Sequence, residues 1–171
     1  MSRLARVFAY GSLMGDNALR FYKGQPARLD GFHRAFNHAS TLRWGTPEHP
    51  CPLLGLSPGG ECWGVAFEVP AGDEREILRK LDRRESGAEY ERRKALVEIG
   101  EAKVQAWVWT TRPEYADGRR SPDPLELDRA LKAAHGIVGT GVEYVRTLMH
   151  ALELRGIRDP MIEGIWQRLQ A

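Results

Sequence analysis

The sequence has few cysteines, no long apolar run and almost no net charge. No apolar stretch approaches the roughly 18 residues that a membrane-spanning helix needs, and the first predicted strand begins so near Met1 that we expect no secretory signal peptide. The formal net charge is +2, and the arginines are scattered among acidic residues rather than gathered into a nucleic-acid-binding surface. We therefore expect a cytoplasmic protein with no membrane or nucleic-acid partner.

The cysteines and histidines do not form a pattern typical of a disulfide framework or a metal centre. Cys51 and Cys62 are the only two cysteines, and in the cytoplasm we expect both to be reduced. His33, His38, His49 and Cys51 crowd one region, but their spacings match none of the usual zinc patterns. The glycine-rich run at 136–141 lacks the lysine of a phosphate-binding loop and the spacing of a dinucleotide-binding turn. We expect no metal and no cofactor.

The arrangement of apolar residues indicates one α+β domain over residues 1–171. At this length a single hydrophobic core is the default, and 42% hydrophobic with 28% charged residues is ordinary for a globular protein. Strand-like runs occupy Val7–Ala9, Ala27–Ala35, Leu53–Leu56, Trp63–Val69, Ala95–Ile99 and Val104–Thr110. Helix-like runs occupy Asp73–Arg84, Leu125–His135, Val142–Arg155 and Met161–Leu169. Because strands come first and most helices late, we expect a small mixed, strongly curled β-sheet or barrel with flanking helices.

Two further local predictions concern the tryptophans and one loop. Trp107 and Trp109 alternate with small apolar residues, which indicates a strand covered on both faces. We expect these two, Trp63 and Trp166 to be core residues rather than a cofactor-stacking surface. The segment Arg112–Pro124 has three prolines and many charges, so it is predicted to be a loop.

The first strand ends in a turn with the sequence Tyr10-Gly11-Ser12-Leu13. Glycine permits backbone angles that other residues resist, so such a turn can aim successive N–H groups in one direction. A cup of this kind binds carboxylates or developing oxyanions. The alternative is a plain strand-end turn with a buried tyrosine ring.

Three more motifs follow the turn in order: Gly45-Thr46-Pro47-Glu48, Gly64-Val65-Ala66-Phe67 and Arg84-Glu85-Ser86-Gly87-Ala88-Glu89-Tyr90. Together with the turn they resemble the gamma-glutamylcyclotransferase family, most closely its ChaC-like, glutathione-degrading branch. The resemblance runs from about Val7 to Asp159. It implies that a small γ-glutamyl substrate such as glutathione is cleaved to 5-oxoproline and a free amine or peptide, without a cofactor.

The resemblance also implies roles for particular residues. Glu85 matches the family's catalytic glutamate, and Tyr10, Gly11, Ser12 and Leu13 match the loop that holds the γ-glutamyl unit. Tyr144 matches a tyrosine of the substrate pocket, to which Tyr90 is added, and Arg43 is a candidate for binding a substrate carboxylate through a bidentate fork. The residues alone leave other interpretations open: a solvated glutamate, core aromatics and a surface arginine. Glu89 is expected to be solvated.

The chain departs from the family pattern at three places. Met14-Gly15-Asp16 follows the turn where ChaC-like proteins often have tryptophan, Trp44 interrupts the usual Arg-Gly pair, and Gly141 stands where asparagine is frequent. These positions belong to the pocket wall, so the sequence does not determine the identity of the substrate's leaving half. The alternatives are a cyclotransferase acting on γ-glutamyl-amines or γ-glutamyl-amino acids, and a non-catalytic binder of γ-glutamyl ligands. The oligomeric state is also open.

Overall fold

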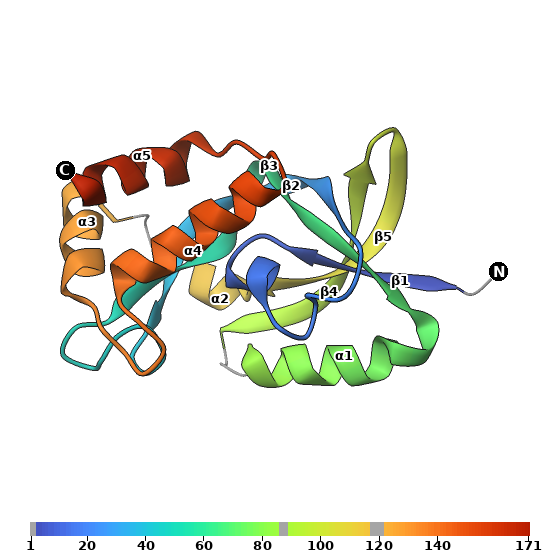
Figure 1. Cartoon of the computed structure of the whole chain (residues 1–171), viewed down its shortest axis with the longest axis horizontal. Coiled ribbons are helices and arrows are strands. Elements are labelled where there is room, and N and C mark those ends of the chain that lie inside the picture. Colours follow the sequence, from blue (N-terminus) through green and yellow to red (C-terminus); the bar gives the residue numbers. More distant parts are fainter. Residues whose placement is uncertain (1–2, 86–88, 117–121) are drawn as a thin grey trace.

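The protein is built on a closed five-stranded β-barrel with helices packed around it (Figure 1). The structure is a computed structural model that describes residues 3–85, 89–116 and 122–171. The barrel order is β1-β3-β2-β4-β5, and the strands are β1 (Leu4–Ala9), β2 (Gly24–Ser40), β3 (Cys51–Pro70), β4 (Tyr90–Ile99) and β5 (Ala102–Thr111). β1 runs antiparallel to β3 and parallel to β5, where Val7 pairs with Trp107 and closes the barrel. The predicted fold class is confirmed.

The two strand-like runs at Leu53–Leu56 and Trp63–Val69 form one strand, so their prediction as separate strands was wrong. β3 pairs with β2 along nearly its whole length, with a register shift between Asp30 and Phe32. Opposite that shift Gly59 and Gly60 have φ of 96° and 74°, which glycine adopts without strain. A Pro-Gly-Gly sequence that resembles a turn therefore bends the strand instead of ending it.

The four long helices lie where the sequence predicts them, within two residues at each end. The helical elements are η1 (a 3₁₀ turn, Ser12–Gly15), α1 (Ala71–Arg84), α2 (Pro113–Ala116), α3 (Pro124–Ala133), α4 (Gly141–Leu154) and α5 (Pro160–Gln170). Side chains of Asp123, Thr140 and Asp159 cap α3, α4 and α5 by accepting backbone N–H bonds. α2 begins the segment predicted to be a loop, and residues 117–121 of that segment lie outside the described residues.

The core consists of two apolar layers separated by the barrel wall. One fills the barrel with alternate strand residues such as Phe8, Leu29 and Val108, and the other joins the outer barrel face to the helices. Trp109 is buried in the outer layer, with Trp107 packed against it, which confirms a strand covered on both faces. Trp63 was wrongly expected in the core: Cys62 faces the barrel interior, so Trp63 points outward and is 39% exposed.

Within the described ranges, the helices are too short or too polar to cross a membrane. Cys51 and Cys62 are buried free thiols, and burial raises their pKa to about 12 and about 11. No group of three or more histidine, cysteine or acidic side chains in the described part of the chain is arranged to hold a metal ion.

Candidate active site

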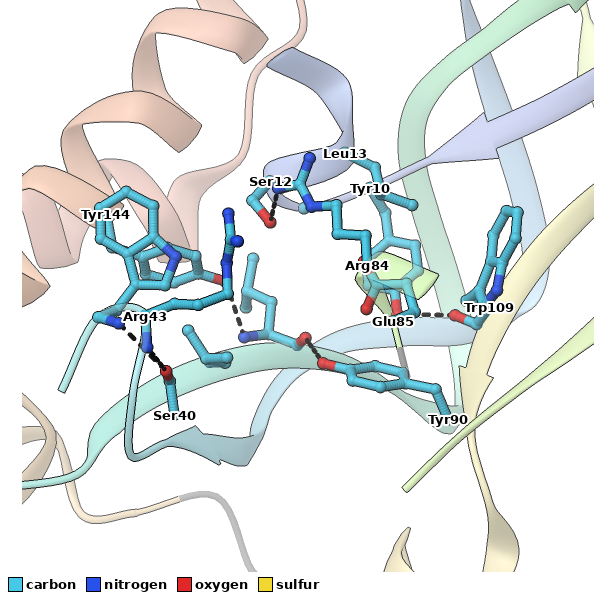
Figure 2. A pocket seen from close by; sticks show the side chains of 14 residues that line it. Tyr10, Ser12, Leu13, Ser40, Arg43, Arg84, Glu85, Tyr90, Trp109 and Tyr144 are labelled. Atoms are coloured by element: carbon cyan, nitrogen blue, oxygen red, sulfur yellow. Dashed lines mark hydrogen bonds between the residues drawn. The ribbon is translucent and has the colours of Figure 1, made fainter. Parts of the chain in front are cut away.

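A cavity lies at the end of β1, where η1, the last turn of α1, α4 and the neighbouring strands meet (Figure 2). Every residue predicted for the site lines it: Tyr10, Gly11, Ser12, Leu13, Arg43, Glu85, Tyr90 and Tyr144. The other lining residues are Ser40, Trp44, Leu53, Leu54, Arg84 and Trp109. The cavity thus brings together residues up to 134 positions apart in the sequence, from Tyr10 to Tyr144.

The turn after β1 is held from both sides. The Tyr10 hydroxyl donates to the Trp109 carbonyl at 2.8 Å, and the Tyr10 carbonyl accepts from Nε of Arg34 at 2.7 Å. Burial raises the pKa of Tyr10 well above its ordinary value, so the phenol stays protonated. The N–H groups of Ser12 and Leu13 open η1 and have no hydrogen-bond partner among the described residues. Both residues line the cavity.

Gly11 precedes η1 and has φ of −128° and ψ of −140°, so it is not in the left-handed region. A Cβ built there would have only Leu54 Cβ within 4 Å, at 3.9 Å. Because Gly11 lines the cavity, the effect of a larger side chain would be to occupy ligand space.

Glu85 ends α1 and presents a carboxylate to the cavity. Its backbone N–H donates to the Leu81 carbonyl at 2.9 Å, so the helix fixes its position. Within the described ranges its carboxylate has no hydrogen-bond or ion-pair partner. Desolvation by burial raises the pKa of Glu85, and the nearby Arg84 and Arg43 lower it in part. The interpretation as an ordinary solvated glutamate is not supported. Gly87 of the same motif lies outside the described residues.

The cavity contains two arginines that are held differently. Arg84 donates from Nη2 to Ser12 Oγ at 2.9 Å and forms an ion pair with Asp16. Arg43 is largely exposed, and in the described part of the chain its guanidinium has no partner. Its backbone is held: the N–H donates to Ser40 Oγ at 3.1 Å, and the carbonyl accepts from the Val138 N–H at 2.8 Å. Arg43 is therefore both a surface arginine and a cavity residue, with a free bidentate donor.

Tyr144 and Tyr90 both form hydrogen bonds with the backbone of Leu54. The Leu54 N–H donates to the Tyr144 hydroxyl at 3.0 Å, and the Tyr90 hydroxyl donates to the Leu54 carbonyl at 3.1 Å. Burial raises the pKa of both phenols, which stay neutral. Tyr144 is 2% exposed, so it is a core residue whose edge also forms part of the cavity wall.

Sequence reasoning did not assign four of the polar or aromatic lining residues to the site. Trp109 was expected only as a core residue. Trp44 was noted only as a departure from the family pattern; its ring lies 5.4 Å from that of Tyr144, tilted by 58°. Arg84 was part of the quoted motif, and its place beside Glu85 was the available signal. Ser40 carries no signal in the sequence.

Glu89 is not the solvated residue that was expected. Its carboxylate lies 2.7 Å from Nδ1 of His38, whose ring stacks on Tyr90 at a centroid distance of 3.9 Å. His38 also contacts Thr111 Oγ1 through Nε2 at 2.6 Å. The expectation failed because these partners come from β2 and β5, which local sequence context does not reveal.

Comparison with solved structures gives the class of fold, a small α+β barrel of the gamma-glutamylcyclotransferase type. A solved yeast gamma-glutamylcyclotransferase specific to glutathione superposes with a TM-score of 0.84 at 20% identity, covering 99% of this chain and 96% of the yeast chain. The family model for ChaC-like proteins matches residues 5–170, so the chain belongs to the ChaC-like protein family.

Curated relatives agree with this assignment. A glutathione-specific gamma-glutamylcyclotransferase of Escherichia coli is 30% identical over 156 residues, which cover 90% of this chain and 67% of the relative. Gamma-glutamylcyclotransferase 2-1 of Arabidopsis thaliana is 33% identical over 160 residues, covering 85% of this chain and 73% of the relative. The predicted family and enzyme class are confirmed.

Proposed function

We propose that the protein cleaves glutathione to 5-oxoproline and Cys-Gly, with Glu85 as its general acid and base. The observation that carries this proposal is the Glu85 carboxylate, which faces the cavity without a partner among the described residues and has a pKa raised by burial. Binding alone does not need a proton carrier. A partly buried carboxylate without a partner lowers the stability of the folded protein, and such groups are typical of sites that perform chemistry. Membership of the ChaC-like family supports the same conclusion.

The reaction needs a proton carrier but no nucleophile from the protein. The α-amino nitrogen of the γ-glutamyl unit attacks that unit's own γ-carbonyl carbon, a new C–N bond closes the five-membered ring, and the bond to the leaving amine breaks. An α-amine with a pKa near 8 is mostly protonated at neutral pH, so it first loses one proton to solvent. Glu85 then takes a second proton from the attacking nitrogen and returns it to the leaving nitrogen, and the released amine takes up a proton from solvent. Holding the substrate folded supplies an effective molarity of about 10⁵ M or more.

The other cavity residues have roles that follow from their contacts. We propose that the free N–H groups of Ser12 and Leu13, in the turn that begins with Tyr10 and Gly11, bind the γ-glutamyl unit and steady the developing oxyanion. Arg43 would pair with a substrate carboxylate, because its guanidinium is the cavity cation that the described residues leave unpaired. Tyr90 and Tyr144 would form the wall against the folded substrate.

Trp44 favours a second candidate substrate class. Trp44 lines the cavity beside Tyr144, at a place where the chain departs from the family pattern, and a bulky ring there suits a smaller leaving half than Cys-Gly. A cyclotransferase for γ-glutamyl-amines or γ-glutamyl-amino acids is therefore the alternative, and a non-catalytic γ-glutamyl binder is the other. In each case we propose a small-molecule partner, no nucleic acid and a cytoplasmic location.

A substrate panel tests these alternatives. The purified protein is incubated with glutathione, a γ-glutamyl-amine, a γ-glutamyl-amino acid, free glutamine and an α-linked glutamyl dipeptide, and the products are identified by mass spectrometry. We expect 5-oxoproline and Cys-Gly from glutathione, and no product from glutamine or the α-linked dipeptide. Release of 5-oxoproline from the γ-glutamyl-amine alone would favour the second substrate class. Calorimetric binding of glutathione with no product from any compound would identify a binder.

A further inference from the structure

Arg84 lines the cavity next to Glu85, but its guanidinium is directed toward Ser12 and not toward the Glu85 carboxylate. Successive residues of a helix project about 100° apart, so two neighbours at the end of α1 leave in different directions. Figure 2 shows the Arg84 side chain extending past Glu85 to Ser12, where Nη2 donates to Oγ at 2.9 Å. The same guanidinium forms an ion pair with Asp16, and the two side chains are 17% and 18% exposed.

Asp16 is itself fixed by the fold. It follows the last residue of η1, its backbone N–H donates to the Leu13 carbonyl at 3.1 Å, and its Oδ1 accepts from the Ala18 N–H at 2.8 Å. The Arg84–Asp16 pair therefore joins two rigid points, the end of η1 and the end of α1. These two points carry the two halves of the proposed site, the N–H groups of the turn and the Glu85 carboxylate.

We propose that Arg84 is a positioning residue and that Asp16 compensates its charge, so that η1 is held against α1 without an unbalanced cation beside Glu85. This inference rests on the proposed function, because it assigns a task to the surroundings of the proposed base. Charge matters here because a half-buried cation acts on a neighbouring carboxylate through a medium less polar than water. An uncompensated arginine favours the carboxylate form and so makes it a weaker base.

The groups that face Glu85 come from every element around it. They are Arg84 of α1, Arg43 between β2 and β3, Tyr10 after β1, Tyr90 of β4 and Tyr144 of α4. The tyrosines are held neutral by burial, so the arginines are the charged groups among them. Arg43 is free to pair with substrate, whereas Arg84 is already paired with Asp16. The structure thus separates a ligand-binding arginine from a structural one.

Substituting Asp16→Asn tests this separation, because asparagine keeps the shape and the oxygen that accepts from Ala18 but removes the charge. We expect the Glu85 pKa, followed by carboxyl ¹³C NMR in the substrate-free protein, to fall by about half a unit or more. The acid limb of the pH profile of kcat/KM should move to lower pH by the same amount, with kcat reduced several-fold and KM little changed. The double substitution Asp16→Asn with Arg84→Met removes both charges and should return the Glu85 pKa to the parental value or above it.

A matched pair elsewhere in the molecule supplies the control. Asp128 of α3 binds Arg168 of α5 through two hydrogen bonds, at 2.6 and 3.0 Å, and neither residue lines the cavity. Asp128→Asn should leave the Glu85 pKa and the pH profile unchanged. A Glu85 pKa that does not move in folded Asp16→Asn protein refutes the charge compensation. An Arg84→Met protein that is altered in KM alone shows that Arg84 binds substrate instead. An inactive parent protein refutes the proposed function, and the NMR measurement still decides the compensation.

Discussion

Glu85 is the residue at which stability and the proposed chemistry oppose each other. Its carboxylate faces a cavity rather than bulk water, and burial raises its pKa. A residue selected only for stability would be neutral or paired at such a place. A general base instead works best when its pKa is brought nearer to the working pH. The burial of Glu85 therefore both lowers the free energy of unfolding and raises the pKa that a general base needs.

The first prediction concerns turnover. Glu85→Gln keeps the size of the side chain but cannot accept and return a proton, so we expect kcat for 5-oxoproline release to fall by at least about 10²-fold. Glu76→Gln is the control on the same helix, because Glu76 is 62% exposed and pairs with Lys80 at the surface. Its turnover should match the parent. If Glu85→Gln keeps more than about a tenth of parental turnover, Glu85 is not the proton carrier.

The second prediction concerns stability and its dependence on pH. The folded protein binds a proton at Glu85 more tightly than the unfolded chain does, because the pKa is raised above its ordinary value of 4.5. The stability that this proton confers is fully present below pH 4.5 and is lost as the pH rises through the folded-state pKa. We therefore expect Glu85→Gln to have a higher Tm than the parent at pH 7, with the difference shrinking toward pH 4.5. A lower Tm at pH 7 would contradict the burial of this charge.

Individual residues were predictable where a short motif carries them. Glu85 and the Tyr10–Leu13 turn each belong to a contiguous motif, so the sequence could identify them as site residues before their contacts were known. Trp44 and Glu89 were not assigned correctly. Their partners Tyr144 and His38 are remote in the sequence, and a stacking or ion-pair contact across 51 or more positions leaves no local pattern.

At the scale of elements, the turn after β1 is tied to the start of α5 by one buried arginine. The Arg34 side chain is 4% exposed; it donates to the carbonyls of Tyr10 and Trp63 and forms an ion pair with Asp159 at 2.9 Å. Asp159 also caps α5 by accepting from the Ile162 N–H at 3.1 Å. One carboxylate thus serves a helix end and a buried charge that fixes the site turn.

The third prediction follows from this double role. Asp159→Ala removes the cap and leaves the buried Arg34 charge without its partner, so we expect a loss of unfolding free energy of about 3–5 kcal/mol in urea titrations. Thr140→Ala removes the capping box of α4 without disturbing a buried charge, and should cost about 1 kcal/mol. Equal losses in the two variants would show that the Arg34–Asp159 pair adds nothing beyond the cap.

Elements were predictable in proportion to how local their signals are. The long helices were found because their apolar periodicity lies within each segment. The capping box of Thr140 and Glu143 at the start of α4 is a local feature of the same kind, although it was not used. β3 was divided in two because its bend at Pro58-Gly59-Gly60 has the composition of a turn. Only the pairing with β2 keeps the strand continuous there, and that pairing is a tertiary property.

At the scale of the whole molecule, barrel closure assembles the cavity. The parallel contact of β1 with β5 brings the Tyr10 turn beside Trp109, and α1 then returns along the outside to place Glu85 opposite the turn. The sequence predicted a curled sheet or barrel from its number of strands but not the strand order. That order depends on long-range pairing: β1 pairs with β3 and not with β2, the next strand in the sequence, and β2 lies between β3 and β4.

The last prediction is that the assembled protein needs no metal ion. The potential ligands that crowd one stretch of the sequence are engaged or separated in the fold: His33 contacts the Gly59 carbonyl through Nδ1, His38 contacts Glu89 and Thr111, and burial raises the pKa of the Cys51 thiol to about 12. A metal needs a deprotonated thiolate or a free imidazole nitrogen, so these groups make a poor ligand set.

We therefore expect dialysis against EDTA to leave both 5-oxoproline release and Tm unchanged. The two measurements separate a catalytic metal from a structural one, since loss of a structural ion lowers Tm as well as activity. Recovery of lost activity on adding zinc would show that the fold holds a metal after all, and a parallel titration of His33→Gln and His49→Gln proteins would locate it. Unchanged kinetics in the chelated protein would mean that the substrate supplies the nucleophile and the protein supplies only the proton carrier. Proton transfer by Glu85 would then be the chemical step that the cavity has to perform.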